Sequence, residues 1–182
     1  IEKAWTPPEY YFHLRSGGHV GAVRSHMAGK FFVRIDLQDF FGSINKTRVT
    51  RCLKALFSYQ NARDWAHAST VFATTGKKQT ILPFGFVQSQ IISAVCFNQS
   101  ALGKCVDNLY GNDSLCVSIY VDDIIISASE EKLCALALEE IRVAVNRSRF
   151  KLNEDKLEGP AESITAFNIV LSNNHIEIEA SR

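Results

Sequence analysis

Several features that decide the class of a protein are scarce or missing in this 182-residue chain. No stretch is long and apolar enough to span a membrane as a helix, and the opening residues, IEKAWTPPEY, lack the apolar region of a signal peptide. The five cysteines form no Cys-x-x-Cys pair, which argues against zinc and disulfides and favours buried thiols in a reducing, cytoplasmic compartment. The net charge of +1 excludes a globally basic or acidic surface, so a charged partner would need a local patch.

Internal repeats, low-complexity tracts and an initiator methionine are also absent, and we expect the chain to be a fragment of a longer protein. What is present is a hydrophobic content of 46%. A chain of this length and composition can form one globular domain with a sizeable core.

The pattern of apolar residues and turn residues predicts a mixed domain. Glycine and proline make the first thirty residues loop-like, and TTGKKQT at 74–80 indicates a turn or short hairpin. A buried strand is expected at 31–37, hairpins at 118–127 and across Asn173-Asn174, a strand or loop at 150–159, and helices at 46–59, 62–73, 89–106 and from a cap at Ser129 to about 147. This order favours an α+β fold with helices on one face of a mostly antiparallel sheet, in the ferredoxin-like β-α-β-β-α-β arrangement.

The stretch SIYVDDIIIS at 118–127 places Asp122 and Asp123 side by side between two β-branched runs. A two-residue hairpin turn normally contains glycine, and adjacent like charges repel each other, so this pair needs an explanation. Asp36 ends the strand predicted at 31–37, which the ferredoxin-like order brings beside the hairpin. Three converging carboxylates fit Mg²⁺, which takes hard oxygen ligands. The alternative is a surface turn with two solvated aspartates.

Basic residues gather on the helix predicted at 46–59. It carries Lys46, Arg48, Arg51 and Lys54 and no acidic residue. A charge run of this kind is most often a solvated face, and that is the interpretation we favour.

With their neighbours, the carboxylates resemble those of the palm and fingers of a reverse transcriptase. Four segments follow the order of that family: RIDLQDFFGSI, LPFGFVQSQIIS, YVDD and LNEDK. Upstream, Arg15-Ser16 and the H-x-x-G-K run of His26, Gly29 and Lys30 resemble the fingers of retron and group II intron enzymes. The closing TAFNIVLSNNHIEI resembles the primer-side hairpin. The resemblance covers nearly the whole chain.

The resemblance implies an RNA-directed DNA polymerase that joins dNTPs to a primer 3′-OH. Asp36 and Asp122 would be bridging ligands of two Mg²⁺ ions, which Mn²⁺ can replace, and Asp123 a weaker third ligand. Lys156 would serve the leaving pyrophosphate as a proton donor or charge partner; the alternative is an ordinary lysine in a polar turn. Phe41 would be a steric gate that rejects the ribose 2′-hydroxyl, while Phe40 packs in the core.

Other residues are assigned by the same resemblance. Phe84 and Gly85 lie in the loop that faces the template and the nucleotide, and Arg15 and Lys30 would contact the phosphates of either the triphosphate or the template. His26 can equally be a loop histidine with satisfied hydrogen bonds. The implied partners are an RNA template, a DNA or RNA primer and dNTPs, with a dedicated non-coding RNA as a further possibility.

The resemblance also divides the chain. It implies a fingers segment at 1–30 and a palm at 31–182, with 46–88 contributing to the fingers. The helical thumb that follows the palm in the family is not present in this chain, so processive synthesis by the fragment alone is not expected.

The chain departs from the family pattern near the template and the primer. Phe84 stands where the family has Gln, Gln90 where it has Pro, Ala94 where it has Asn and Ala166 where it has Gly. These departures resemble bacterial defence-associated, abortive-infection-like members, some of which make DNA without a template or from a protein primer. Two other hypotheses stay open. One is a nucleotide cyclase, although Tyr120-Val121 replaces its Gly-Gly; the other is a polymerase-like scaffold that binds RNA with little activity.

Overall fold

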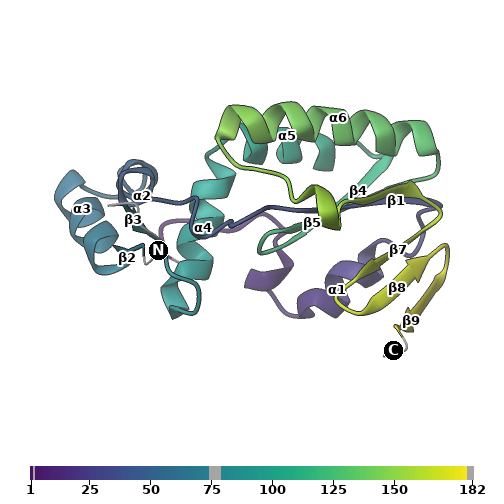
Figure 1. Cartoon of the computed structure of the whole chain (residues 1–182), viewed down its shortest axis with the longest axis horizontal. Helices are drawn as coiled ribbons and strands as arrows, with labels where there is room; N and C mark the ends of the chain where they lie inside the picture. Colours follow the sequence, from purple (N-terminus) through teal and green to yellow (C-terminus); the bar gives the residue numbers. More distant parts are fainter. Residues whose placement is uncertain (2, 74–78, 180–182) are drawn as a thin grey trace.

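The structure, a computed structural model, describes residues 1, 3–73 and 79–179 (Figure 1). Its helices are η1 (Phe12–Leu14), α1 (Gly18–Ser25), α2 (Lys46–Leu53), α3 (Tyr59–Ala68), α4 (Val87–Asn98), α5 (Ala101–Tyr110), α6 (Glu131–Ser148) and η2 (Glu154–Lys156). Its strands are β1 (Phe31–Asp36), β2 (Val71–Phe72), β3 (Thr80–Ile81), β4 (Leu115–Tyr120), β5 (Asp123–Ala128), β6 (Glu158–Ala161), β7 (Ser163–Ala166), β8 (Ile169–Ser172) and β9 (His175–Ile178). Within these ranges, no helix combines the length and the hydropathy that a membrane crossing requires.

Four strands form the central sheet in the order β4-β5-β1-β6, and every neighbouring pair is antiparallel. Helices separate β1 from β4, and α6 separates β5 from β6. This is the predicted ferredoxin-like β-α-β-β-α-β arrangement, and the predicted α+β fold class is confirmed. β1 pairs with β5 over its whole length, from Phe31 opposite Ala128 to Asp36 opposite Asp123.

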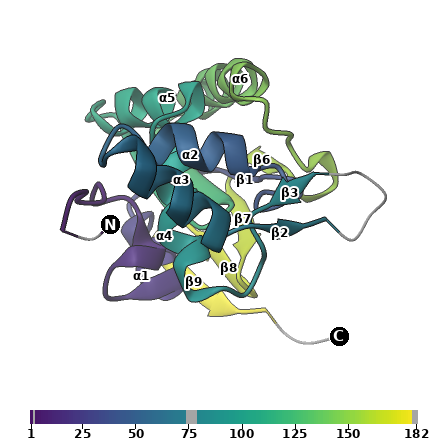
Figure 2. The same cartoon turned by 90° about the vertical axis from the view of Figure 1, so that its left-hand side faces the viewer.

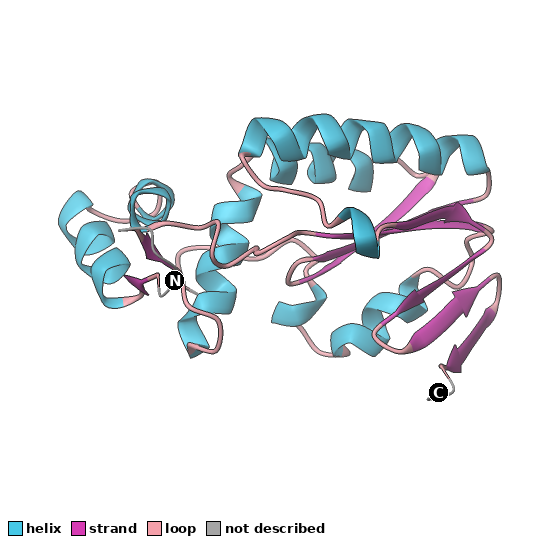
Figure 3. Cartoon of the chain, viewed as in Figure 1, coloured by secondary structure: helices cyan, strands magenta, loops and turns pink. Residues whose placement is uncertain are grey.

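The two faces of the central sheet have different covers (Figure 3). Because side chains alternate along a strand, Val33 and Ile35 point to the face beneath α5 and α6, where the main apolar core forms. Phe32 and Arg34 point to the opposite face, which α1 and the small sheet β7-β8-β9 cover. The helical layer was predicted; of the second layer only the hairpin across Asn173-Asn174 was predicted, and its packing against the central sheet was not.

A smaller unit lies at one end of the long axis, and Figure 2 looks onto it. In it, α2 packs against α3 and α4, and β2 pairs with β3. Leu82 N donates a hydrogen bond to Ile44 O at 2.9 Å, which fastens the ribbon near the start of α2. Apart from α4, which continues to Asn98, the unit lies within the 46–88 segment that we assigned to the fingers.

The N-terminal segment packs on the central sheet. Ile119 N in β4 donates to Tyr10 O at 2.7 Å, and α1 lies against β4. Residues 1–30, which we assigned to the fingers by resemblance, therefore contact the palm sheet directly, and the division of the chain into fingers and palm stays a prediction.

Several predicted element boundaries were wrong. The glycine-rich segment at 18–25 is helical, because Ala22 and Val23 are buried against the sheet and packing outweighs local propensity. The helix expected at 62–73 begins at Tyr59, capped by Ser58, and ends before the strand β2. The helix expected at 46–59 ends at Leu53.

Two further helix predictions need correction. The helix expected at 89–106 is two helices, because Ser100 Oγ accepts the N–H of Gly103 at 3.1 Å and starts α5 anew. Glu130 rather than Ser129 occupies the N-cap of α6, and its side chain makes no capping hydrogen bond. Five of the seven residues of TTGKKQT, at 74–78, lie outside the described residues, although their flanking strands pair.

The C-terminal part forms a three-stranded sheet, where one hairpin was predicted. The turn at Asn173-Asn174 is confirmed, since Ser172 pairs with His175. A second hairpin connects β7 to β8 through Phe167 and Asn168, with φ of 56° and 59°. A bulky residue such as phenylalanine is rare in that region, so the usual turn signals could not indicate it.

Candidate active site

The three aspartates singled out in the sequence lie at one end of the central sheet. Asp36 is the last residue of β1 and is paired with Asp123, the first residue of β5. Asp122 and Val121 form the turn between β4 and β5, because Tyr120 pairs with Asp123. Leu37 N donates to Asp122 O at 3.1 Å, so the backbone of the turn is joined directly to the chain that leaves β1.

The turn has an unusual backbone. Val121 has φ 61°, a conformation that a β-branched residue rarely adopts. Its N–H donates to His13 Nδ1 at 3.0 Å. Burial lowers the pKa of His13 to about 4, so the imidazole is neutral at pH 7 and its Nδ1 can accept this bond. The N-terminal segment therefore helps to hold the carboxylate-bearing turn.

Asp36 is buried and fully engaged by the segment that follows α6. Lys156 Nζ lies 3.1 Å from Asp36 Oδ2, and Asn153 Nδ2 donates to Oδ1 at 2.9 Å. Asn153 N also donates to Asp36 O at 2.9 Å. This segment fixes Asp36 through both its carboxylate and its backbone.

Asp123 is held by a different cation. Arg34 Nε donates to Asp123 Oδ1 at 2.9 Å, and Arg34 Nη1 donates to Thr165 O at 2.8 Å. Glu158 joins the group, because its Oε2 accepts the N–H of Thr165 at 2.7 Å and its Oε1 lies 3.4 Å from Arg34 Nη1. Arg34 thus connects the carboxylate end of the central sheet to the small C-terminal sheet.

Asp122 differs from its neighbours in having no cation bound to its side chain among the described residues. Burial raises the pKa of Asp122 to about 6, with further increases from the charges of Asp123 and Asp36 against the opposing charge of Lys156. Burial also raises the pKa of Asp123, against the opposing effect of Arg34. The negative charge here is costly unless a cation compensates it.

The donor set fits a divalent cation in chemistry but not in its present arrangement. Carboxylate oxygens are the ligands that Mg²⁺ prefers. Within the described ranges, however, no three His, Cys, Asp or Glu side chains are grouped so that they could hold a metal ion. Asp36 is turned to Lys156 and Asp123 to Arg34. The three aspartates therefore meet at one end of the sheet as predicted, but their side chains do not point to a common centre. To bind a metal ion, Asp36 and Asp123 would have to release Lys156 and Arg34.

An aromatic pocket of about 290 Å³ adjoins Asp122. Phe41 and Phe84 line it, with ring centroids 5.8 Å apart in an edge-to-face arrangement. Phe40 also borders it but is buried and packs against Phe97 and Phe150, as the core interpretation predicted. The structure thus brings Phe41 and Phe84 together beside Asp122.

The loop before α4 is open around Phe84. The side chain of Phe84 is 87% exposed, and Gly85 has φ 94°, a conformation that other residues rarely adopt. Gln90, near the start of α4, is exposed as well. Ala94 is buried in α4 and Ala166 in β7.

Lys30, which was predicted to contact phosphates, does not lie near the three aspartates, and Arg15 has other partners. Lys30 precedes β1 at the end opposite Asp36, and six strand residues span about 20 Å. Lys30 is therefore not brought beside Asp36, and its contact with the triphosphate or the template stays a prediction. Arg15 donates to Glu9 O and lies over the ring of Phe12, with 4.9 Å between Cζ and the ring centroid.

His26 is a satisfied buried histidine, which was the alternative interpretation. Its Nδ1 lies 2.8 Å from Ser127 Oγ and its Nε2 lies 2.8 Å from Ser118 Oγ. Burial lowers its pKa to about 3, so the ring is neutral. Gly29 allows this packing, because a Cβ on it would lie 2.6 Å from the Ser127 Cβ.

Sequence reasoning missed three residues of the site: Arg34, Asn153 and His13. Arg34 had a visible signal, since it is the one charge inside the apolar run FFVRI. Asn153 stands three residues before Lys156 in a segment that we had singled out. His13 had no signal, because its contact with Val121 spans 108 residues of sequence.

Solved structures with a similar fold include several polymerases. A foamy viral protease–reverse transcriptase in complex with double-stranded DNA matches with a TM-score of 0.60 and 17% identity, over 90% of this chain and 25% of that chain. Telomerase from Candida tropicalis matches with a TM-score of 0.62 and 10% identity, over 88% of this chain and 35% of that one. Telomerase from Candida albicans, in complex with a fragment of telomeric RNA, matches with a TM-score of 0.58 and 10% identity, over 79% and 29%. At these identities the likeness shows the fold alone, and this chain spans a quarter to about a third of those proteins.

The family assignment comes from a sequence model. The model for the family described as "Reverse transcriptase (RNA-dependent DNA polymerase)" matches residues 4–166, which include every strand of the central sheet and all three aspartates. The chain therefore belongs to the reverse transcriptase family.

Proposed function

We propose that this chain is the catalytic part of an RNA-directed DNA polymerase, which transfers the nucleotidyl group of a dNTP to a primer 3′-OH opposite an RNA template. The observation that carries the proposal is the position of Asp122. It lies beside Asp36 and Asp123 at the end of the sheet and also lines the pocket of Phe41 and Phe84. A nucleotide in that pocket would have its phosphates next to the carboxylates.

The proposed roles follow from the surroundings of each residue. Asp36 and Asp122 hold divalent cations, with Asp123 as a third oxygen donor. Bound cations would neutralise the attacking and leaving oxygens of the phosphoryl transfer. If a cation were bound at Asp36, Lys156 would lose that partner, and its ammonium group could then hold the pyrophosphate or give it a proton.

The pocket supports selection of the sugar. Phe41 is only partly buried and faces the same cavity as Asp122, so its ring can limit the space beneath the ribose. A 2′-hydroxyl would collide with that ring, whereas a deoxyribose would fit. Phe41 therefore acts by volume, and Phe40 supports it from the core.

A direct test is Mg²⁺-dependent incorporation of labelled dNTPs by this chain, with an RNA template and a DNA primer, compared with Mn²⁺ and with EDTA. Product that requires both the cation and the template supports the proposal. Cation-dependent release of a cyclic nucleotide would instead support the cyclase hypothesis, and RNA binding without any product would support the scaffold.

A second candidate function, template-free addition, is favoured by Phe84. Its exposed ring offers a flat apolar face, and stacking contributes about 1–3 kcal/mol per base whatever the base is. A glutamine there would offer a directional hydrogen bond instead. We expect Phe84→Gln to lower template-free addition relative to templated synthesis, which sequencing of the products would measure. Products of unchanged sequence and yield would leave Phe84 as a packing variant.

A role in bacterial antiphage defence and a dedicated non-coding RNA partner rest on the resemblance to defence-associated members alone. Both stay predictions. Co-purification of RNA with the protein from its native cells is the first measurement for the second of them.

A further inference from the structure

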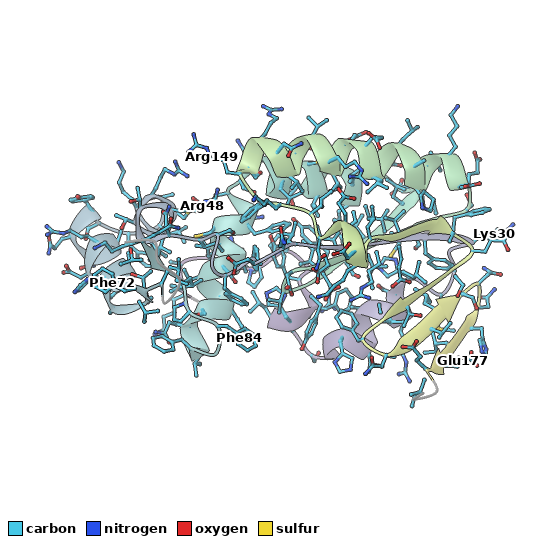
Figure 4. All side chains as sticks on the ribbon, in the orientation of Figure 1. Lys30, Arg48, Phe72, Phe84, Arg149 and Glu177 are labelled. Atoms are coloured by element: carbon cyan, nitrogen blue, oxygen red, sulfur yellow. The ribbon has the colours of Figure 1, made fainter. Side chains whose placement is uncertain are left out.

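A second cavity lies on the helical side of the sheet, away from the carboxylates. It has a volume of about 740 Å³ and is bordered by α2 along its length, by the ends of α4 and α6, and by the start of α5. Figure 4 labels Arg48 and Arg149 on this side, near the end of α6, and Phe84 at the opposite edge of the molecule. The cavity is therefore distinct from the nucleotide pocket.

The lining of this cavity is strongly basic. It contains four arginines and no acidic residue: Arg48, Arg51, Arg147 and Arg149. Its other polar groups include the N-caps of two helices, Asn45 of α2 and Ser100 of α5. Helix N-termini carry partial positive charge, so they add to the field of the arginines.

Arg48 shows that this charge is not neutralised by the protein. One of its amino groups donates to Ser148 O, and its Cζ lies 4.5 Å from the ring centroid of Phe150. Its Nη1 is buried and has no hydrogen-bond partner among the described residues. Burial, with the nearby charges of Arg51 and Arg149, lowers the pKa of Arg48. The expectation that the basic face of this helix is simply solvated was therefore wrong for Arg48.

The chemistry of the lining selects the ligand. Guanidinium groups form paired hydrogen bonds with phosphate oxygens. No aromatic residue lines the cavity, and Arg48 covers the face of Phe150, so a nucleobase has no stacking platform here. A ligand that presents phosphates and no buried base fits this lining better than a free nucleotide does.

We propose that this cavity binds the phosphates of a single-stranded RNA, outside the nucleotide pocket and without regard to sequence. The proposal rests on the proposed function in that the strand is a nucleic acid, but it requires no catalysis. Contacts of this kind hold the position of a strand, and they make its affinity depend on salt.

Binding of a fluorescein-labelled oligouridine of about 20 nucleotides tests the proposal. Anisotropy is measured in EDTA and without dNTPs, between about 50 and 200 mM KCl. The variant is Arg51→Gln with Arg147→Gln; both side chains are exposed, and glutamine keeps the helices. Each lost phosphate contact reduces the salt slope by about 0.7, so we expect a slope smaller by about 1.4 and an affinity about 25-fold lower at 0.1 M salt.

The matched control is Arg63→Gln with Lys132→Gln, which removes the same charge from exposed positions outside the cavity. Thermal melts establish that both double variants are folded. Equal weakening by the two double variants, or an unchanged slope in the first, overturns the proposal. Calorimetry with inorganic pyrophosphate is the second arm. If pyrophosphate binding depends on Arg51 and Arg147 while the slope for RNA does not, the cavity takes a free polyphosphate and the proposal is wrong.

The outcome is separable from that of the proposed function. Loss of dNTP incorporation with normal RNA binding would count against the polymerase proposal alone. Normal incorporation on a short primer with an unchanged salt slope would count against the cavity alone.

Discussion

The two faces of the central sheet differ in the interactions that their side chains make. On the face beneath α5 and α6, β1 and β5 contribute Val33, Ile35, Ile124 and Ile126, all buried and apolar. On the other face the same strands contribute Arg34, Asp123 and Ser127, each of which makes a specific polar contact. Burial of apolar area is not directional, whereas hydrogen bonds and ion pairs fix atoms in place. One face therefore stabilises the sheet mainly by apolar burial, whereas the other combines a smaller apolar cluster, which includes Phe32 and Ile125, with polar groups held in fixed positions.

The comparison distinguishes interactions that stabilise the fold from interactions that fix the positions of the carboxylates. A partly buried ion pair such as that of Arg34 and Asp123 is weak evidence for stability, because desolvation opposes its attraction. Its effect here is to hold one carboxylate in a fixed place. Changes on the apolar face should lower the unfolding free energy and leave the chemistry of the folded molecules intact. Changes to Arg34 and the aspartates on the polar face should mainly alter the chemistry, whereas a fully buried polar group such as His26 also contributes to stability.

The largest expected effect is that of Asp122→Asn on incorporation. Removal of a cation ligand should cost about 4 kcal/mol of transition-state stabilisation, or about a thousandfold in rate. The fold should not suffer in EDTA, because the change removes a carboxylate that burial and its neighbours oppose. Steady-state incorporation and thermal melts measure the two effects.

Asp113→Asn, at an exposed position before β4, is the control for Asp122→Asn and should leave the rate unchanged. Near-normal activity of Asp122→Asn, or a sharp fall of its melting temperature in EDTA, would contradict the assignment of Asp122 as a ligand.

Ile126→Ala should have the opposite profile. Ile126 is fully buried in β5 on the helical face, and truncation there should lower the unfolding free energy by about 2–5 kcal/mol. Activity per folded molecule, measured well below the melting temperature, should stay the same. Val143→Ala, at an exposed site on α6, should change stability by less than about 0.5 kcal/mol. A loss of activity without a loss of stability in Ile126→Ala would show that the two faces are not separable.

His26 gives the polar face a dependence on pH. Its pKa is about 3 in the folded state and 6.5 when unperturbed, so between these values the unfolded chain takes up the proton. The contribution of neutral His26 to the unfolding free energy is complete above pH 6.5 and is lost as the pH falls. The loss is about 1.4 kcal/mol per pH unit, which amounts to about 2 kcal/mol by pH 5. His26→Gln should flatten this slope in urea unfolding series, whereas His67→Gln, at an exposed site, should not. Parallel slopes for wild type and His26→Gln would mean that another group dominates.

The smallest expected effect is on sugar selection. Phe41→Ala should increase the use of rNTPs relative to dNTPs by about tenfold, about 1.4 kcal/mol, because the gate works by volume. Phe72→Ala, an exposed aromatic on β2, is the control and should not change the ratio. The ratio is measured with both substrates in side-by-side reactions. If it does not change in Phe41→Ala, Phe41 is a core residue and the gate lies elsewhere.

The sequence predicted the parts of this molecule that follow from periodicity. The alternation around SIYVDDIIIS indicated the hairpin, and the strand at 31–37 placed Asp36 at its end, so the meeting of the three carboxylates at one end of the sheet was predictable. Their immediate partners were not. Arg34 reaches Asp123 across 89 residues of sequence, and Asn153 reaches Asp36 across 117, and no local pattern reports contacts of that range.

The wrong predictions have a common cause, which is that tertiary packing overrides local signals. The glycine-rich segment of α1 is helical because it packs against the sheet. The Arg48 side chain is partly buried because it packs on the ring of Phe150 and donates a hydrogen bond to Ser148 O at the end of α6. The break between α4 and α5 lies within a run whose apolar spacing is continuous; it is marked by the capping hydroxyl of Ser100 and by Gly103, where a Cβ would lie 2.3 Å from Asn98 O.

The close approach at Gly29 has a consequence for recognising related chains. His26 can bridge Ser118 and Ser127 only if the backbone three residues later passes against Ser127 with no side chain in between, and any β-carbon there would overlap it. The spacing His-x-x-Gly is thus a rule of steric fit rather than a mark of ligand binding. A sequence search can combine His-x-x-Gly with a serine or threonine on each of the two strands that correspond to β4 and β5. It should find chains that share this buried histidine bridge, including chains that have lost the three aspartates.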